Sequence, residues 1–397
     1  MLEPVWSRNL DKNLLPRKQP RISQGTDMSR IVTLLLALLL LTALSIATFS
    51  PAKSEPKTTT VPDDYPTIVD AVGNAIAGDT IFFKNGTYEG PIDQTVIIDK
   101  SLTLFGQSAE NTILNLHPNY TETWILTTRF ISADDAMIIN ANDVKLANLT
   151  LHSISKIRVN GDRAQITGNN IQSGSTVKGL IINGSECNVT NNTVLGRINL
   201  SGSSNLISHN GFYSLILQSS DENTIDSNWF KYLQLQASNN NTILGNNISY
   251  ENIQYIIDIS NSTNNIFQGN RVKAVNWNTN LKLGVQAQNN TFYGNTFIGE
   301  DELVVADASA YGNSWDNGVY GNFWSNYNGT DIRGDGIGDK PYIIDRNNQD
   351  RYPLMKPLAE GVFEYPFPAL LVVSVIAIIG AMAASVTLWI YFKKRKR

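Results

Sequence analysis

An asparagine-containing unit that recurs every 18 residues constrains the fold of this chain more than any other feature. The unit reads Asn-x-apolar-x-x-Asn-x-apolar, and it continues down the chain with spacings of 24 and 25 residues. A fixed short period of this kind is the sequence signature of a solenoid. Its first asparagine stands at Asn205, Asn223, Asn241, Asn265 and Asn290, and its second at Asn210, Asn228, Asn246, Asn270 and Asn295.

The residues between the asparagines favour strands over helices. Apolar and polar side chains alternate, as in Leu233-Gln234-Leu235-Gln236, which is the period of a strand with one buried face. A coil of three short strands and three turns needs roughly 18 to 25 residues, and coils stack at about 4.8 Å. Equivalent asparagines then lie over one another, where their amides bond along the axis. The sequence therefore predicts an all-β fold, a parallel β-helix of about a dozen coils.

The repeats and their two flanks resemble a known family. The opening segment Val61–Gly90 is similar to the first coil of pectin-esterase-like β-helices, and Tyr320–Met355 resembles the end of NosD-like chains. Over residues 61–358 the chain resembles right-handed parallel β-helix proteins of the pectin-lyase-like, carbohydrate-binding and sugar-hydrolase (CASH) type. Within that type it is most similar to the NosD-like group, named for an accessory protein of nitrous oxide reductase. The resemblance implies a right-handed solenoid.

Two apolar segments flank the repeats and predict the organisation of the chain. The run after Arg30 is typical of a secretory signal, and residues 369–392 are long enough to span a bilayer. The basic residues after this second run predict a cytoplasmic C-terminus and an extracellular solenoid, in a single-pass protein of the cell membrane. The expected parts are a leader extension or misassigned start (1–27), a signal peptide or signal anchor (28–52), a linker (53–60), the β-helix domain (61–358) with a helical cap at Thr67–Ala77, a second linker (359–368), the transmembrane helix (369–392) and a cytoplasmic tail (393–397).

Composition narrows the classes of partner. The net charge is −4 and no basic stripe lies within the repeats, which argues against nucleic acid. The single cysteine, Cys187, replaces the first asparagine of a repeat, and we expect a buried, inert thiol. Sequons predict glycosylation on exposed loops, although many arise by chance in so Asn-rich a chain. They begin at Asn85, Asn119, Asn148, Asn183, Asn188, Asn191, Asn199, Asn240, Asn247, Asn261, Asn289 and Asn328.

Catalytic and copper chemistry have little support in the sequence. Asp134-Asp135 with Lys156 and Arg158 faintly resembles a polygalacturonase, but that family's other motifs are missing. Neighbouring carboxylates on one strand point to opposite faces and pair poorly as acid and base. Copper needs clustered His, Met or Cys, whereas His117, His152 and His209 stand far apart and at different points of the repeat. We therefore favour a non-catalytic role for this chain over an enzymatic one.

An acidic segment near the end of the domain predicts a calcium site. In DIRGDGIGD, Asp331, Asp335 and Asp339 are four residues apart among glycines. Calcium prefers several oxygens on a flexible loop, which these carboxylates and nearby carbonyls offer. The alternative is a polar turn in which the Asp side chains bind backbone amides.

Exposed aromatic residues predict a ligand-binding strip. If Asn228 and Phe230 face inward, Trp229 faces outward, in a column with Gly211, Asn247, Arg271 and Thr296 of neighbouring coils. Aromatic rings beside amides and an Arg favour stacking on sugars, and packing against adjacent loops is the alternative. The predicted ligand-binding residues are Trp229, Tyr232, Arg271 and Trp277.

Together these features predict a membrane-anchored extracellular β-helix protein that binds polysaccharide or builds the cell envelope. The first alternative is a polysaccharide lyase or hydrolase on the same fold. The second, which the resemblance implies, is a NosD-like, copper-related accessory protein of a membrane metalloenzyme.

Overall fold

The computed structural model divides the chain into two units, Met1–Glu55 and Pro56–Arg397, of which the second contains the strands. Among the described residues no helix has the length and apolar character needed to cross a bilayer. The predicted segments 1–27, 359–368, 369–392 and 393–397 lie outside the described residues, as does most of 28–52. The described residues are 32–33, 35–36, 55–125, 128–173, 179–250, 253–275, 279–300 and 302–358.

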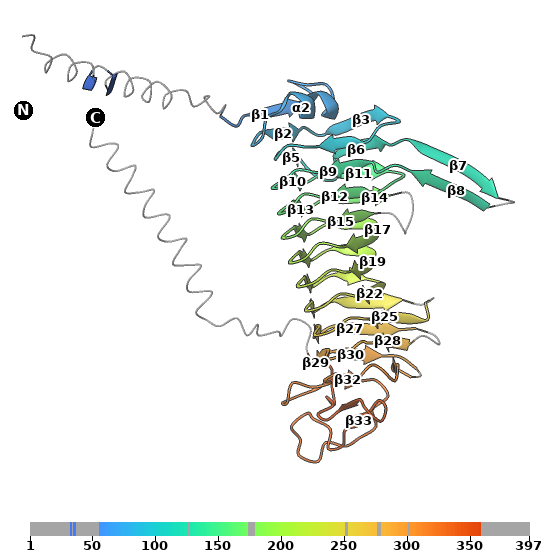
Figure 1. Ribbon diagram of the computed structural model, residues 1–397. Helices are drawn as coiled ribbons and strands as arrows, with labels where there is room; N and C mark the ends of the chain where they lie inside the picture. Colours follow the sequence, from blue (N-terminus) through green and yellow to red (C-terminus); the bar gives the residue numbers. More distant parts are fainter. Residues whose placement is uncertain are drawn as a thin grey trace, which may run out of the picture. The chain divides into compact units, whose positions relative to one another are not determined.

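The second unit is a stack of coils with three columns of parallel strands (Figure 1). The first column is an 11-stranded sheet, and a 19-stranded sheet holds the second and third columns, which β17 and β19 join. This arrangement confirms the predicted parallel β-helix.

The first column consists of β1 (Thr58–Val61), β2 (Thr80–Phe83), β5 (Thr103–Gly106), β10 (Lys145–Ala147), β13 (Gln165–Thr167), β16 (Asn188–Thr190), β18 (Leu206–Ser208), β20 (Thr224–Asp226), β23 (Thr242–Leu244), β26 (Ile266–Gln268) and β29 (Thr291–Tyr293). The second consists of β3 (Gly86–Ile92), β6 (Thr112–His117), β11 (Thr150–Ser153), β14 (Asn170–Ser173), β17 (Thr193–Leu200), β19 (Gly211–Gln218), β21 (Trp229–Phe230), β24 (Asn247–Tyr250), β27 (Arg271–Ala274), β30 (Thr296–Ile298) and β32 (Phe323–Trp324). The third adds β4 (Val96–Ile98), β9 (Met137–Ile139), β12 (Ile157–Val159), β15 (Leu180–Ile182), β22 (Tyr232–Gln236), β25 (Tyr255–Ser260), β28 (Thr279–Leu283) and β31 (Val304–Ala306).

The repeated asparagines form two buried ladders along the axis, as predicted. Asn228 shows the pattern: its Oδ1 accepts from the backbone N–H and Nδ2 of Asn210, and its Nδ2 donates to Oδ1 of Asn246. A residue with positive φ, such as Gly245, precedes each second-ladder asparagine from Asn169 to Asn295, which suits the Gly and Asn found at most of these positions. The first ladder contains Cys187, Asn205, Asn223, Asn241, Asn265, Asn290 and Asn313, and the second Asn169, Asn192, Asn210, Asn228, Asn246, Asn270, Asn295 and Asn322.

Apolar residues of each strand fill the interior between the ladders. Leu233 and Leu235 of β22 are both fully buried and stack on Ile257 and Ile259 of β25. Aromatic rings stack from coil to coil in the same way, with the Phe297 and Trp324 centroids 4.6 Å apart. Each rung is thus stabilised mainly by its neighbours, as in other solenoids.

The first coils are closed by helix α2 (Ile68–Asn74), which starts at the N-cap Thr67 and buries Ile68 and Val72. The predicted cap extended to Ala77, but Ile76 lies beyond the end of the helix and is 39% exposed. The predicted linker 53–60 already contains the start of β1. A hairpin of β7 (Tyr120–Ile125) and β8 (Thr128–Ala133) projects from the stack (Figure 1).

The last coils are closed by a short antiparallel hairpin, β33 (Tyr342–Ile343) and β34 (Gln349–Asp350). Here the second ladder ends on a carboxylate, because Asp350 Oδ2 accepts from the backbone N–H of Asn322 at 2.7 Å and from Trp324 Nε1 at 2.8 Å. Asp350 is fully buried, and burial raises its pKa to about 6.

Candidate functional site

Two adjoining hollows lie on the outer face of the second column, with volumes of about 570 and 690 Å³. They share Trp229 and Lys231, and together we name them the basic groove. Its floor crosses β14, β17, β19, β21, β24 and β27. The groove is lined by side chains that include Leu195, Tyr213, Trp229, Lys231, Tyr250, Arg271 and Lys273.

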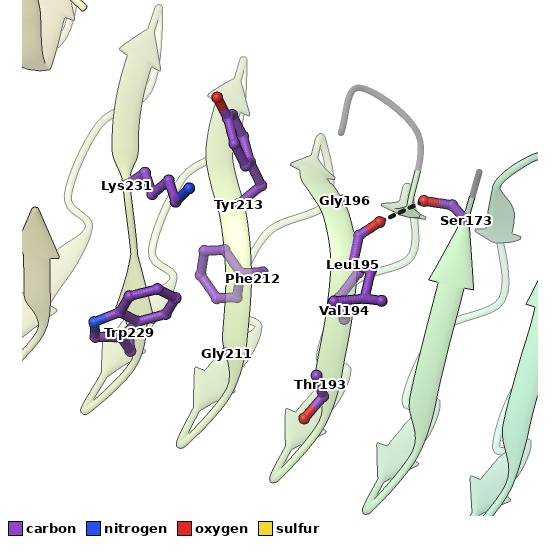
Figure 2. A pocket seen from close by; sticks show the side chains of 10 residues that line it. All are labelled: Ser173, Thr193, Val194, Leu195, Gly196, Gly211, Phe212, Tyr213, Trp229 and Lys231. Carbon is purple, nitrogen blue, oxygen red and sulfur yellow. Dashed lines mark hydrogen bonds between the residues drawn. The ribbon is translucent and has the colours of Figure 1, made fainter. Parts of the chain in front are cut away.

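Trp229 is the aromatic centre of the groove (Figure 2). It stands between Gly211 and Asn247 of the neighbouring strands and is 51% exposed. An added Cβ at Gly211 would meet no atom within 4 Å, so the space beside the indole is open. The register of the predicted column Gly211, Trp229, Asn247, Arg271 and Thr296 is confirmed, although Thr296 at its end is buried.

Three cationic side chains line the same groove. Lys273 lies two residues after Arg271 on β27, so these two side chains share a face of that strand, and Lys231 lies at the turn that follows β21. The strand register places Arg271 beside Asn247 and Lys273 beside Ser249. Within the described part of the chain the lining contains no Asp or Glu. The groove therefore presents concentrated positive charge on a chain whose net charge is negative.

Lys231 is held by two tyrosines. Its Nζ lies 4.8 Å from the ring centroid of Tyr213 and 5.2 Å from that of Tyr250, which are cation–π distances. The two phenol oxygens form a hydrogen bond with each other. That hydrogen bond, together with burial, raises the pKa of Tyr213, so its phenol stays protonated and is a poor general base. The two tyrosines therefore hold the ammonium group of Lys231 in a fixed position.

The structure brings only part of the predicted ligand set together. Trp229 and Arg271 line the groove, whereas Tyr232 lies in β22 of the third column, where burial raises its pKa to about 12. Trp277 lies outside the described residues. Sequence reasoning missed Lys231 and Lys273. Strand alternation from Arg271 could have found Lys273, whereas Lys231 lies at a turn after β21.

The residues weighed for sugar cleavage lie elsewhere. Asp135 is 9% exposed and forms ion pairs with Lys156 Nζ and Arg158 Nε on the outer side of the third column. This carboxylate therefore neutralises the two cations that resembled part of a polygalacturonase site. Asp134 is not among the residues that line the basic groove.

The acidic segment forms a hydrogen-bonded loop. Asp331 accepts from the backbone N–H groups of Asp335 and Gly336, and Asp339 accepts from that of Ile332. Arg333 pairs with Asp335 at 3.4 Å. These contacts are those of the alternative polar turn, and calcium binding by Asp331, Asp335 and Asp339 stays a prediction.

Two of the three histidines line the same hollow in the folded chain. His152 on β11 lies beside Asn115 on β6, and His117 is two residues further along β6, so both line one hollow. His209 occupies a positive-φ turn next to the second ladder. Among the residues that the structure describes, no group of three His, Cys, Asp or Glu side chains is placed to hold a metal ion. As they stand, these residues do not fit a copper centre.

Part of this chain matches a known protein family, and its fold is similar to several solved structures. Residues 199–329 match the family model described as "Periplasmic copper-binding protein (NosD)". A search of curated proteins finds no match. Similar solved structures include an alginate lyase from Paenibacillus sp., with 14% identity, a TM-score of 0.40, and coverage of 67% of this chain and 97% of that one. They also include the Dettilon tailspike protein, with 12% identity, a TM-score of 0.42, and coverage of 68% and 66%. A third is the A-module of a mannuronan C-5 epimerase from Azotobacter vinelandii, with 10% identity, a TM-score of 0.34, and coverage of 63% and 92%.

The family match covers about a third of the chain and includes the coils that form the C-terminal half of the basic groove. It confirms the resemblance to the NosD-like group inferred from the repeats. Residues 199–329 are therefore similar to the NosD family, and the strand pairing shows the parallel β-helix independently of that match.

Proposed function

We propose that this protein binds acidic polysaccharide at the cell surface through the basic groove. The observation that carries the proposal is the placement of a half-exposed Trp229 among Lys231, Arg271 and Lys273, with no carboxylate in the described lining. An indole face stacks on the C–H face of a sugar ring, and fixed cations pair with uronate carboxylates. The ligand class is therefore a chain of uronic acid units.

The energetics favour a polymer over a single sugar. An exposed ion pair contributes about 0.2–1 kcal/mol, so no single contact in the groove binds tightly. Trp229 and Arg271 lie on strands two rungs apart, or roughly 10 Å along the axis. A polyanionic chain that reaches several of these side chains at once gains from multivalency. Since the contacts are exposed, binding should weaken as salt rises.

The surface location is part of the same proposal and rests on the sequence. The apolar run at 369–392 followed by the basic tail 393–397 supports a C-terminal anchor with the β-helix outside. Binding is favoured over cleavage because the described groove lining offers no carboxylate pair and the phenol of Tyr213 stays protonated. A NosD-like accessory role remains the other alternative, and the histidine geometry does not favour it.

The test is retention of the full chain, purified in detergent, on polyuronate and on a neutral glucan. Wild type should bind the polyuronate at least tenfold more tightly, and the difference should shrink in high salt. A variant carrying Lys231→Gln, Arg271→Gln and Lys273→Gln should lose this preference. Lys145→Gln, an exposed lysine on β10 in the first column, is the matched control.

A second variant separates binding from stability. Gly211→Val introduces a side chain into the open space beside Trp229 and suits a strand, so it should block the groove while the protein stays folded. Equal binding of both polymers, or full binding by the Gly211→Val and triple variants, would refute the proposal. Ultraviolet absorbance of unsaturated products, or new reducing ends, would reveal a lyase or hydrolase and replace binding by cleavage.

A further inference from the structure

A second hollow, of opposite charge, lies on the same face of the solenoid near its N-terminal end. It is built on β3, β6 and β11 and has a volume of about 670 Å³. Its polar side chains include Glu89, Asp93, Asn115, His117, His152 and Ser153. Among the described residues no Lys or Arg lines it. We name it the acidic hollow, and it shares no residue with the basic groove.

Glu89 is fixed at the centre of a hydrogen-bonded network. Its two carboxylate oxygens bind Nδ2 of Asn115 and Nε2 of His117, each at 2.7 Å. Asn115 Oδ1 in turn lies 3.2 Å from Nδ1 of His152. The hydrogen bonds from His117 and Asn115 lower the pKa of Glu89, so the carboxylate is ionised at neutral pH. The network therefore holds a negative charge in a defined position.

This carboxylate still has capacity for a ligand. An ionised carboxylate offers about four acceptor positions, of which the network uses two. The Glu89 side chain is 64% exposed. Asp93 adds a second negative charge to the lining, and no cation in the described lining cancels it when the histidines are neutral. The hollow is thus electrostatically complementary to a small cation.

The walls of the hollow are apolar. Ile92 is 76% exposed and Tyr120 is 49% exposed, which are high values for large apolar side chains. Leu116, Pro118 and Ile154 extend the same surface. A carboxylate beside an exposed aromatic ring suits a ligand that carries a primary ammonium group on a ring with an apolar face.

We propose that the acidic hollow binds an amino sugar with a free ammonium group. The ammonium donates to the unused acceptor positions of Glu89, and the sugar ring lies against Tyr120 and Ile92. N-acetylation removes the charge and two of the three N–H donors, and it adds bulk at that point. The site therefore distinguishes free from acetylated amino sugars, a ligand class different from that of the basic groove.

The test compares a β-linked glucosamine oligomer with its fully N-acetylated form, by calorimetry on the full chain in detergent. The free amine should bind at least tenfold more tightly, because a hydrogen bond to an ionised partner is among the stronger ones. Glu89→Gln should remove this difference, whereas Glu186→Gln, an exposed glutamate elsewhere, should not. The variant lacking Lys231, Arg271 and Lys273 should keep it, so the two sites fail independently.

Three results would overturn the proposal. The first is equal binding of the acetylated and free oligomers, and the second is unchanged amine binding in Glu89→Gln. The third is binding of Zn²⁺ or Cu²⁺ alone that displaces the amine and is lost in His117→Gln and His152→Gln, which would make the hollow a metal site. Circular dichroism of each variant shows whether it has folded.

Discussion

Removing one asparagine from the middle of the second ladder should destabilise the whole domain. In Asn228→Ala, the backbone N–H of Asn210 loses its acceptor, and the carbonyl of Ile207 loses the Nδ2 that donates to it at 2.7 Å. Asn210 Nδ2 keeps two other acceptors, the carbonyls of Val189 and Ser208. One buried N–H is thus left unsatisfied, at about 1–3 kcal/mol, and the two hydrogen bonds that Asn228 Nδ2 donates to Ile207 and Asn246 are lost, at about 0.5–1.5 kcal/mol each. We expect a loss of about 2–6 kcal/mol, a large part of an ordinary domain's stability.

The assay is urea unfolding of the full chain in detergent, followed by circular dichroism. The matched control is Asn188→Ala, an exposed asparagine on β16, which should change the free energy of unfolding by less than about 0.5 kcal/mol. The comparison requires equal m-values, so that both proteins expose similar surface on unfolding. If Asn228→Ala unfolds at the same urea concentration as the control, the ladder does not stabilise the fold and the reasoning is refuted.

Two further predictions concern buried groups. The pKa of Asp350 is about 6 in the folded chain and 3.8 ordinarily, so the folded chain binds the proton of Asp350 more tightly than the unfolded chain does. This proton binding stabilises the fold fully when the pH is below 3.8, and the stabilisation is lost as the pH rises through about 6. From acid to neutral pH, wild type should lose roughly 3 kcal/mol of unfolding free energy relative to Asp350→Asn, and parallel pH profiles would contradict this. Burial raises the pKa of the Cys187 thiol, so a thiol reagent should label the native protein far more slowly than the urea-unfolded protein. Equal labelling rates would show that Cys187 is accessible.

The architecture could be predicted because the signal repeats. Each coil uses the same asparagine positions and the same alternation, so one correct register places every strand of a column. Trp229 and Arg271 were placed on the outer face by that register alone. Cys187, too, was expected to be buried because it occupies a ladder position, and it is.

The misplaced residues lie where the register is interrupted. The chain turns at Lys231, between β21 and β22, so Tyr232 belongs to another column than Trp229. Alternation along the sequence does not reveal such a corner. His117 and His152 are 35 residues apart, more than one repeat, because the β7–β8 hairpin is inserted between their coils. The insertion concealed their proximity from a count of spacings.

The Asn–Asp junction at the end of the second ladder has a consequence for how such a chain can lengthen. Every asparagine both accepts from the coil before it and donates to the coil after it, so an additional 18-residue unit fits between any two existing ones. Ionised Asp350 accepts from Asn322 but has no amide hydrogen to pass on. Duplication can therefore extend this molecule from within, whereas a second copy docking on its far end finds no donor in that row.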